Sequence, residues 1–280
     1  MPLFRRFDGD RVRVSGTRAI MPFIMPQRAG AIVQFEQELD VTGAQAFCDE
    51  ATSRGEKLTV FHVFTYAAVQ TLAARPRLNR FTSGGHIYQR RQIELSFTVK
   101  KSLNDDAAMG AIKRRFDPHA DFAGHLERLG SGVREGRSSE KNQTDKELSF
   151  FLRLPAFLLA LSVTLARWLD AHNVLPRALI ESDPLYCSVF VANLGSVGLD
   201  AVFHHLYEWG NCPIFAALGR VREVERGGVM RKFVTVKYTF DERIEDGLYC
   251  ARSLEHLRKI VEEWPAGAAS ATAGVAALAP

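Results

Sequence analysis

A glycine pair near the C-terminus, Gly227-Gly228, separates two long strand-like runs, Pro213–Glu225 and Val229–Asp241. Glycine readily adopts the positive φ angles of a tight two-residue turn, so the pair predicts an antiparallel β-hairpin. The segment that follows, Leu248–Glu263, carries apolar residues at helical spacing and predicts a helix. Hairpin strands and helices in separate stretches of sequence indicate an α+β domain.

Upstream patterns predict further elements of both kinds. The expected strands are Ala31–Leu39, Ile93–Val99, Ala107–Phe116 and the continuously apolar, buried strand Leu185–Ala192. The expected helices are a short or kinked one in Thr17–Arg28, one from Asp40 or Thr42 to about Gly55, one from Thr59 to Pro76, and one from Asp121 to about Arg137. We expect one domain over residues 1–264, with a polar linker at 138–147, and a flexible Ala/Gly/Pro tail over 265–280.

The composition narrows the class of protein. Of 280 residues, 46% are hydrophobic and 24% charged, and the net charge is +4, as in ordinary globular proteins. This small, interspersed charge gives no sign of a nucleic-acid partner. The four cysteines are widely spaced and form no C-x-x-C pair, so we expect buried, reduced thiols in a cytoplasmic protein and no metal site.

One apolar segment, Leu148–Leu169, raises the question of a membrane. Its uncharged part, Leu154–Ala166, lies between Arg153 and Arg167 and is shorter than the about 20 residues that a spanning helix needs. We therefore expect a helix buried in the core or in an oligomer interface. Peripheral contact with a membrane surface through Phe150–Trp168 is the alternative.

Two histidines stand side by side in the segment Phe203–Gly210. Histidine is the side chain best suited to proton transfer near neutral pH, which makes His204 and His205 candidate catalytic residues. Adjacent side chains on a regular element point in different directions, so we expect at most one of them at a given site. The alternative is that both only pack within a loop.

Acidic residues crowd around Arg243 in the segment Tyr238–Gly247, between the last strand and the last helix. Neighbouring carboxylates raise one another's pKa, which can turn one of them into a general base. The alternative is a turn whose charges Arg243 neutralises and which Asp246-Gly247 closes.

The same segment carries a resemblance to a known family. Phe240–Gly247 resembles the motif Asp-His-Arg-x-x-Asp-Gly of the dihydrolipoyl acyltransferase catalytic core of 2-oxoacid dehydrogenase complexes, which is related to chloramphenicol acetyltransferase. Three further segments match in the right order, and the resemblance spans roughly residues 15–264. They are Arg75–Asn79, Asn193–Gly198 and Ile214–Gly219. The resemblance implies a chloramphenicol acetyltransferase-like fold, a mixed sheet flanked by helices.

The resemblance also implies a homotrimer with the active site in a tunnel between subunits, where coenzyme A and a small-molecule acyl acceptor enter from opposite sides. The family's general base is a histidine, and a Ser or Thr hydrogen-bonds the oxyanion. The matching positions here hold Glu242 and Ala192. The structural positions are kept by Asp246, Arg243, Asn193 and Gly247, with Asp246 implied as an ion-pair partner. No lipoyl domain precedes the core, so no covalently attached lipoyl group is expected in this chain.

Two functions remain open. One is a stand-alone acyltransferase that uses coenzyme A (acyl-CoA) as substrate, with Glu242, His204 or His205 as the base. The other is a catalytically inactive trimeric scaffold or ligand-binding protein of the same fold. Nearby hydroxyls at Ser188 and Ser196 do not occupy the oxyanion position. Removing one oxyanion donor typically lowers the rate about 10²–10³-fold, so an active protein needs replacement groups.

Overall fold

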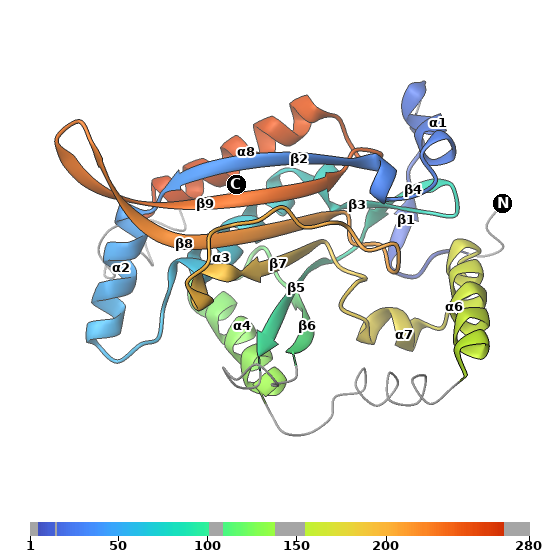
Figure 1. Ribbon diagram of the computed structural model, residues 1–280, viewed down its shortest axis with the longest axis horizontal. Helices are drawn as coiled ribbons and strands as arrows, with labels where there is room; N and C mark the ends of the chain where they lie inside the picture. The colour runs from blue at the N-terminus through green and yellow to red at the C-terminus, as the bar shows by residue number, and fades with distance from the viewer. Residues whose placement is uncertain (1–4, 15, 101–108, 138–154, 266–280) are drawn as a thin grey trace.

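Two β-sheets organise the molecule (Figure 1). The computed structural model describes residues 5–14, 16–100, 109–137 and 155–265. The larger sheet has the strand order β2-β9-β8-β7-β5-β6, and the smaller has β1-β4-β3. The strands are β1 (Gly9–Arg11), β2 (Ile32–Asp40), β3 (Arg80–Ser83), β4 (His86–Arg90), β5 (Ile93–Lys100), β6 (Met109–Phe116), β7 (Val189–Asn193), β8 (Ile214–Arg226) and β9 (Val229–Asp241).

The helices lie mostly in the first half of the chain and at its end. They are α1 (Thr17–Ile24), α2 (Thr42–Ser53), α3 (Val60–Ala74), α4 (Phe122–Arg137), α6 (Ala156–Ala171), α7 (Arg177–Ser182) and α8 (Gly247–Glu262). Short 3₁₀ turns lie at Ala29–Ala31, Pro76–Asn79 and Leu194–Val197.

The larger sheet is mixed, as expected. β7 runs parallel to both of its neighbours, with Phe97 opposite Val191 and Phe190 opposite Phe215, whereas the other pairs are antiparallel. β8 and β9 form the expected hairpin, and both turn glycines have positive φ angles, 64° at Gly227 and 79° at Gly228. The mixed sheet and its flanking helices confirm the predicted α+β fold class.

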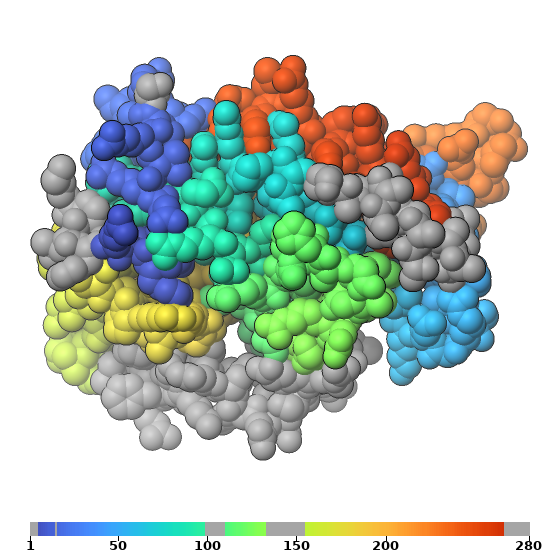
Figure 2. Space-filling view, turned by 180° about the vertical axis from the view of Figure 1, so that it is seen from behind, coloured from blue at the N-terminus to red at the C-terminus, as the bar shows by residue number. Residues whose placement is uncertain are grey.

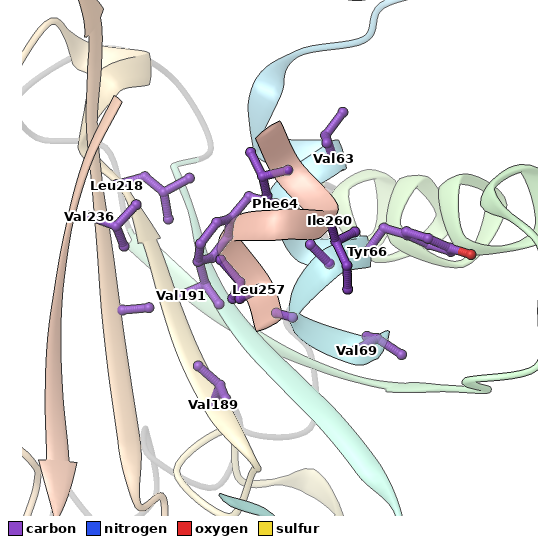
Figure 3. Close-up of a cluster of buried hydrophobic side chains, with 14 of the residues drawn as sticks. Val63, Phe64, Tyr66, Val69, Val189, Val191, Leu218, Val236, Leu257 and Ile260 are labelled. Atoms are coloured by element: carbon purple, nitrogen blue, oxygen red, sulfur yellow. The ribbon is translucent and has the colours of Figure 1, made fainter. Parts of the chain in front are cut away.

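The main core fills the space between one face of the larger sheet and helices α3 and α8 (Figure 3). Alternate strand residues such as Val191 and Val236 point toward Phe64 of α3 and Leu257 of α8. Side chains of this size each contribute about 1.5–3 kcal/mol when fully buried. The extended, partly apolar strands and the apolar helices therefore position each other through this layer.

The opposite face of the same sheet is covered by irregular chain and not by helices. Its buried residues form a second cluster with the irregular chain that follows β7: Cys187, Phe190, Leu206, Cys212, Phe215 and Ala217, with Ala192 partly buried beside them. The segment 200–213 contains no helix or strand and includes both histidines of the pair. This face of the sheet is therefore covered by the candidate segment that contains His204 and His205.

Buried charges join the smaller sheet to its surroundings. Arg6 bonds Asp8 at 2.6 Å and Asp170 of α6 at 2.8 Å. Asn211 donates to Asp8 at 2.9 Å and accepts from Arg90 at 2.5 Å. The N-terminal segment, α6 and the loop before β8 are thus held together by one polar network.

Helix α6 differs from the expectation of a core helix, because none of its residues is buried in the single chain. Phe157 is 71% exposed and Trp168 51%, and Leu161 and Leu165 continue this apolar stripe. Residues 148–154 lie outside the described ranges. Helices α1 and α6 lie along one edge of the molecule, opposite the tip of the β8–β9 hairpin (Figures 1 and 2). No described helix combines the length and apolar character needed to cross a bilayer.

Other elements show where the sequence-based expectations were incomplete. The β3–β4 hairpin, which turns at Gly84-Gly85, and helix α7 were not predicted. The remaining expected strands and helices lie within a few residues of their predicted positions. The linker at 138–147 and the tail at 266–280 lie outside the described ranges, so both stay predictions.

Candidate functional site

The turn between β9 and α8 is built around a buried ion pair. Arg243 donates from Nε to Asp241 Oδ1 at 2.8 Å and from Nη2 to Asp241 Oδ2 at 2.7 Å. Its Nη1 donates to the carbonyl of Met25 at 2.8 Å, which joins the turn to the end of α1. Since two parallel bonds fix a guanidinium against a carboxylate, Arg243 is well suited to hold this turn in one geometry.

The neighbouring carboxylates, those of Glu245 and Asp246, also have structural partners. Glu245 accepts from Arg80 at 3.0 Å and lies 3.6 Å from Arg77 and 3.9 Å from Arg18. Asp246 is exposed and caps α8, which begins at Gly247, by accepting from the backbone N–H of Tyr249 at 2.8 Å; this bond lowers the pKa of Asp246. Among the described residues, Asp241 and Glu245 form the ion pairs of this turn, and the ion-pair role implied for Asp246 stays a prediction.

Glu242 is half-buried between these neighbours. Its backbone N–H donates to Ala31 at 2.9 Å, and its carbonyl accepts from Arg18 at 2.8 Å. No hydrogen bond or ion pair to its carboxylate is seen among the described residues. The carboxylates beside it, Asp241 and Glu245, are paired with Arg243 and Arg80.

Strand register separates Glu242 from Ala192. Ala192 pairs with Ala217 of β8, and Ala217 pairs with Lys237 of β9. Lys237 lies five residues before Glu242, which corresponds to about 17 Å along an extended strand. One chain therefore does not bring together the two positions that match the family's catalytic groups.

His204, in contrast, lies on the same sheet face as Ala192. Its ring stacks on Phe215 with centroids 3.9 Å apart and an interplanar angle of 9°, and Phe215 stacks on Phe190 at 5.1 Å. Ala192 packs against the cluster that contains both phenylalanines. The carbonyl of His204 accepts from Thr239 Oγ1 at 2.6 Å, which fixes the loop to β9.

The hydrogen bonds of His204 define its tautomer. Nδ1 lies 2.7 Å from the carbonyl oxygen of His205, and a carbonyl can only accept, so Nδ1 carries the proton. Nε2 then has a free lone pair, and no hydrogen bond to it is seen in the described part of the chain. Burial lowers the pKa of His204 below its usual 6.5, so the ring is mostly neutral at pH 7. A neutral imidazole oriented in this way is suited to accept a proton.

His205 lies beside this ring and not on the opposite side of an element. The two imidazoles stack with centroids 4.4 Å apart, and His205 is 4.9 Å from Tyr207. The rule that adjacent side chains diverge holds for regular helices and strands and does not apply to this irregular loop. The expectation that at most one of the two histidines serves a given site stays a prediction.

The nearby serine hydroxyls are used in the structure. Ser188 is fully buried and accepts from the backbone N–H of Glu94 at 2.9 Å, which links β5 to the start of β7. Ser196 donates to the carbonyl of Asn193 at 2.7 Å, and Asn193 Oδ1 accepts from the Ser196 N–H at 3.2 Å. Asn193 therefore keeps a structural position, as the cap of the turn after β7.

Lys237 is a polar residue at this face that was not singled out from the sequence. Its Nζ lies 4.9 Å from the centre of the Phe203 ring and 3.4 Å from Glu36. The available signal was alternation, because Lys237 and Thr239 are polar residues at every second position of the apolar run Val229–Asp241. They mark the strand face opposite the helices.

Comparisons with known proteins bear on the fold. No family model and no curated protein matches the chain. Among solved structures, a probable dihydrolipoamide acetyltransferase of Listeria monocytogenes is 15% identical with a TM-score of 0.59, covering 91% of this chain and 95% of that one. The dihydrolipoamide acetyltransferase of Azotobacter vinelandii is 16% identical with a TM-score of 0.56, covering 94% and 98%. A chloramphenicol acetyltransferase is 12% identical with a TM-score of 0.57, covering 91% and 98%. The chain thus has the chloramphenicol acetyltransferase-like fold of these acyltransferases.

Proposed function

We propose that the protein is a coenzyme A-dependent acyltransferase in which His204 is the general base. The observation that carries the proposal is the orientation of this imidazole, with Nδ1–H bonded to the carbonyl of His205 and Nε2 left to accept a proton. Its position on the same sheet face as Ala192 supports it. Glu242, fixed at the far end of β9, does not serve this role within the same chain.

The proposed reaction transfers the acyl group of acyl-CoA, a thioester, to the acceptor. Nε2 of His204 takes the proton of an acceptor thiol, amine or hydroxyl as the acceptor atom attacks the thioester carbon of acyl-CoA. The C–S bond then breaks, and the imidazolium returns its proton to the departing CoA sulfur. A histidine in this role typically contributes about 10²–10⁴-fold to the rate.

We propose in addition that the chain forms a homotrimer with this site near a subunit interface. The loop around the site exposes large apolar side chains, Leu199 at 57% and Val202 at 53%. Exposed apolar residues gathered at one place are typical of an interaction surface.

The first experiment measures CoA release from a panel of acyl-CoAs with mixed thiol, amine and hydroxyl acceptors. We expect turnover by the wild type and a loss of about 10²–10⁴-fold in kcat/KM for His204→Gln. His205→Gln and Glu242→Gln are the matched controls. Since the pKa of His204 is lowered, kcat/KM should stay level as pH falls to 6.5 and decline below it.

Three outcomes contradict this assignment. Equal activity of His204→Gln and wild type would exclude His204 as the base, and loss in Glu242→Gln alone would transfer the role to that residue. If the wild type binds CoA without any turnover, the protein is an inactive scaffold or ligand-binding protein of this fold. Size-exclusion chromatography with light scattering tests the trimer.

A second proposal concerns the edge formed by α1 and α6. We propose that this edge contacts an anionic membrane surface, because apolar residues on both helices face solvent there: Phe23 is 62% exposed and Leu161 63%. Arg11 and Arg13, in the segment that precedes α1, are exposed and add positive charge. Apolar side chains flanked by arginines match the chemistry of an anionic bilayer surface.

Vesicle flotation tests this contact. The wild type should float with phosphatidylglycerol-containing vesicles and less with phosphatidylcholine alone, and Leu161→Gln/Trp168→Gln should abolish flotation. Val229→Gln is the control, since Val229 is 56% exposed at the opposite end of the molecule. Failure of the wild type to float would overturn the proposal. Loss of trimers in the double variant would instead make α6 a subunit contact.

A further inference from the structure

A polar cavity lies apart from the stacked histidines, beside the far end of their loop. Its volume is about 210 Å³. Its walls come from the end of α1, the Gly84-Gly85 turn, the end of α6, the loop at Glu208–Gly210, and the β9–α8 turn. Charged residues on the walls are Arg28, Arg167, Arg243, Asp170 and Glu208.

Most of these charges already have a partner. Arg243 donates two hydrogen bonds to the carboxylate of Asp241, and Asp170 accepts from Arg6 at 2.8 Å. Arg167, at the end of α6, is half-exposed, and its nearest carboxylate oxygen is that of Glu208 at 3.9 Å. Arg167 is therefore only loosely paired.

Arg28 is the exception, because it is buried at 7% exposure and has only weak compensation for its charge. Its Nη1 donates to the carbonyl of Tyr207 at 2.5 Å and its Nη2 to that of Gly210 at 3.1 Å, and both acceptors are neutral. Its Nε–H is buried and has no hydrogen-bond partner in the described part of the chain. Asp241 Oδ2 lies 3.8 Å from this atom, but Arg243 and Thr82 already occupy that carboxylate.

A buried guanidinium with an unused donor is costly unless an anion or another acceptor meets it. The cavity beside Arg28 has room for such a group, and Arg167 lies on its wall as a second cation. Ser83, also on the wall, already accepts from Arg6 at 3.0 Å and donates to the carbonyl of Asp170 at 3.3 Å. We propose that this cavity binds a small molecule bearing a carboxylate or a phosphate, anchored by Arg28 and closed in by Arg167.

The cavity is linked to the stacked histidines through the loop that carries them. Arg28 holds Tyr207 and Gly210, which follow His204 and His205 in the same irregular loop. An anion on Arg28 would fix the end of this loop. Binding in the cavity does not depend on the acyl-transfer proposal, and it is measured without acyl-CoA.

The test titrates the protein with inorganic phosphate and, separately, with acetate and malonate, at ionic strength held constant with chloride. Trp209 lines the cavity, so its fluorescence reports occupancy, and calorimetry gives Kd. We expect saturable binding, weakened about tenfold by Arg167→Gln and at least about tenfold by Arg28→Lys, which keeps the charge and removes the Nε–H. The phosphate and carboxylate arms show which anion the cavity prefers.

The matched control is Arg177→Gln. Arg177 is an exposed arginine of α7 that pairs with Glu181 and does not line the cavity. This variant should bind as the wild type does. Absence of saturable binding, or equal binding by wild type and Arg167→Gln, would overturn the proposal. If Arg28→Lys does not fold, Arg167→Gln still tests the cavity wall. Loss of anion binding with acyl transfer unchanged would separate this site from the proposed activity.

Discussion

The imidazole of His204 lies flat on Phe215, while the carboxylate of Glu242 lies at the far end of β9. Both residues were candidates for the same role from the sequence. The difference between them comes from long-range pairing, because register decides which positions share a stretch of the sheet. A short motif does not contain the register, so the sequence could name both candidates but could not rank them.

His125 is a buried histidine outside the candidate site, and it predicts how stability responds to acid. Burial lowers the pKa of His125 to about 3, and its Nε2 lies 3.0 Å from Thr65 Oγ1. Thr65 donates to the carbonyl of His62, so Nε2 of His125 donates to Thr65, and the lowered pKa keeps the ring neutral near pH 7. Between pH 6.5 and 3 the unfolded chain binds one more proton here than the folded protein does, so stability falls as pH falls.

Urea denaturation at several pH values measures this dependence. From pH 6.5 to 5, His125 should account for about 2 kcal/mol of the loss in the free energy of unfolding. His125→Gln should be less stable at pH 7 but show a correspondingly weaker decline toward pH 5. A decline as steep as that of the wild type would contradict the assignment to His125.

At the scale of single elements, helix α8 depends on the residue that precedes it. Asp246 caps its N-terminus, and loss of such a cap typically costs about 0.5–2 kcal/mol. Asp246→Ala should therefore lower the free energy of unfolding by about 1 kcal/mol, and Asp246→Asn should restore most of it. The measurement is chemical denaturation of both variants. Equal losses in both would show that the charge, and not the cap, is what matters.

The sequence predicted element boundaries correctly where a capping residue or a turn glycine marks them. Thr59 caps α3 together with His62, and Gly227-Gly228 turns the β8–β9 hairpin, as the sequence indicated. The β3–β4 hairpin at Gly84-Gly85 carried the same kind of glycine signal, but its strands are only four and five residues long. Helix α6 was predicted to exist, yet its apolar character could not show whether protein or lipid covers it.

Helix α6 also allows a prediction of its own. Because no side chain of α6 is buried, Leu161→Gln should change the free energy of unfolding of the monomer by less than about 0.5 kcal/mol. Leu257→Ala in α8, at 5% exposure, should cost about 2–5 kcal/mol. Denaturation of the two variants side by side makes the comparison. A large loss for Leu161→Gln would mean that α6 is covered in the assembled protein.

At the scale of the whole molecule, the two faces of the larger sheet have separate roles. One face is filled by helices and forms the main core, whereas the other carries the stacked histidines under an irregular loop. The sequence patterns predicted most of the strands. They could not show which segments cover each face of the sheet, because those segments lie far away in the chain.

The pairing of β2 with β9 carries a consequence for how the protein is made. Ile32 lies opposite Asp241, so the edge strand β2 can pair only after β9, the last strand, has been synthesised. At about 5–20 residues per second, a ribosome needs about 10–40 s to synthesise the intervening chain. Until β8, β9 and α8 are made, the apolar helix α3 lacks most of the residues that cover it. Nascent chains halted after Arg226 should therefore be protease-sensitive and bound by chaperones, whereas release of the complete chain should be followed by slow, cooperative acquisition of protease resistance.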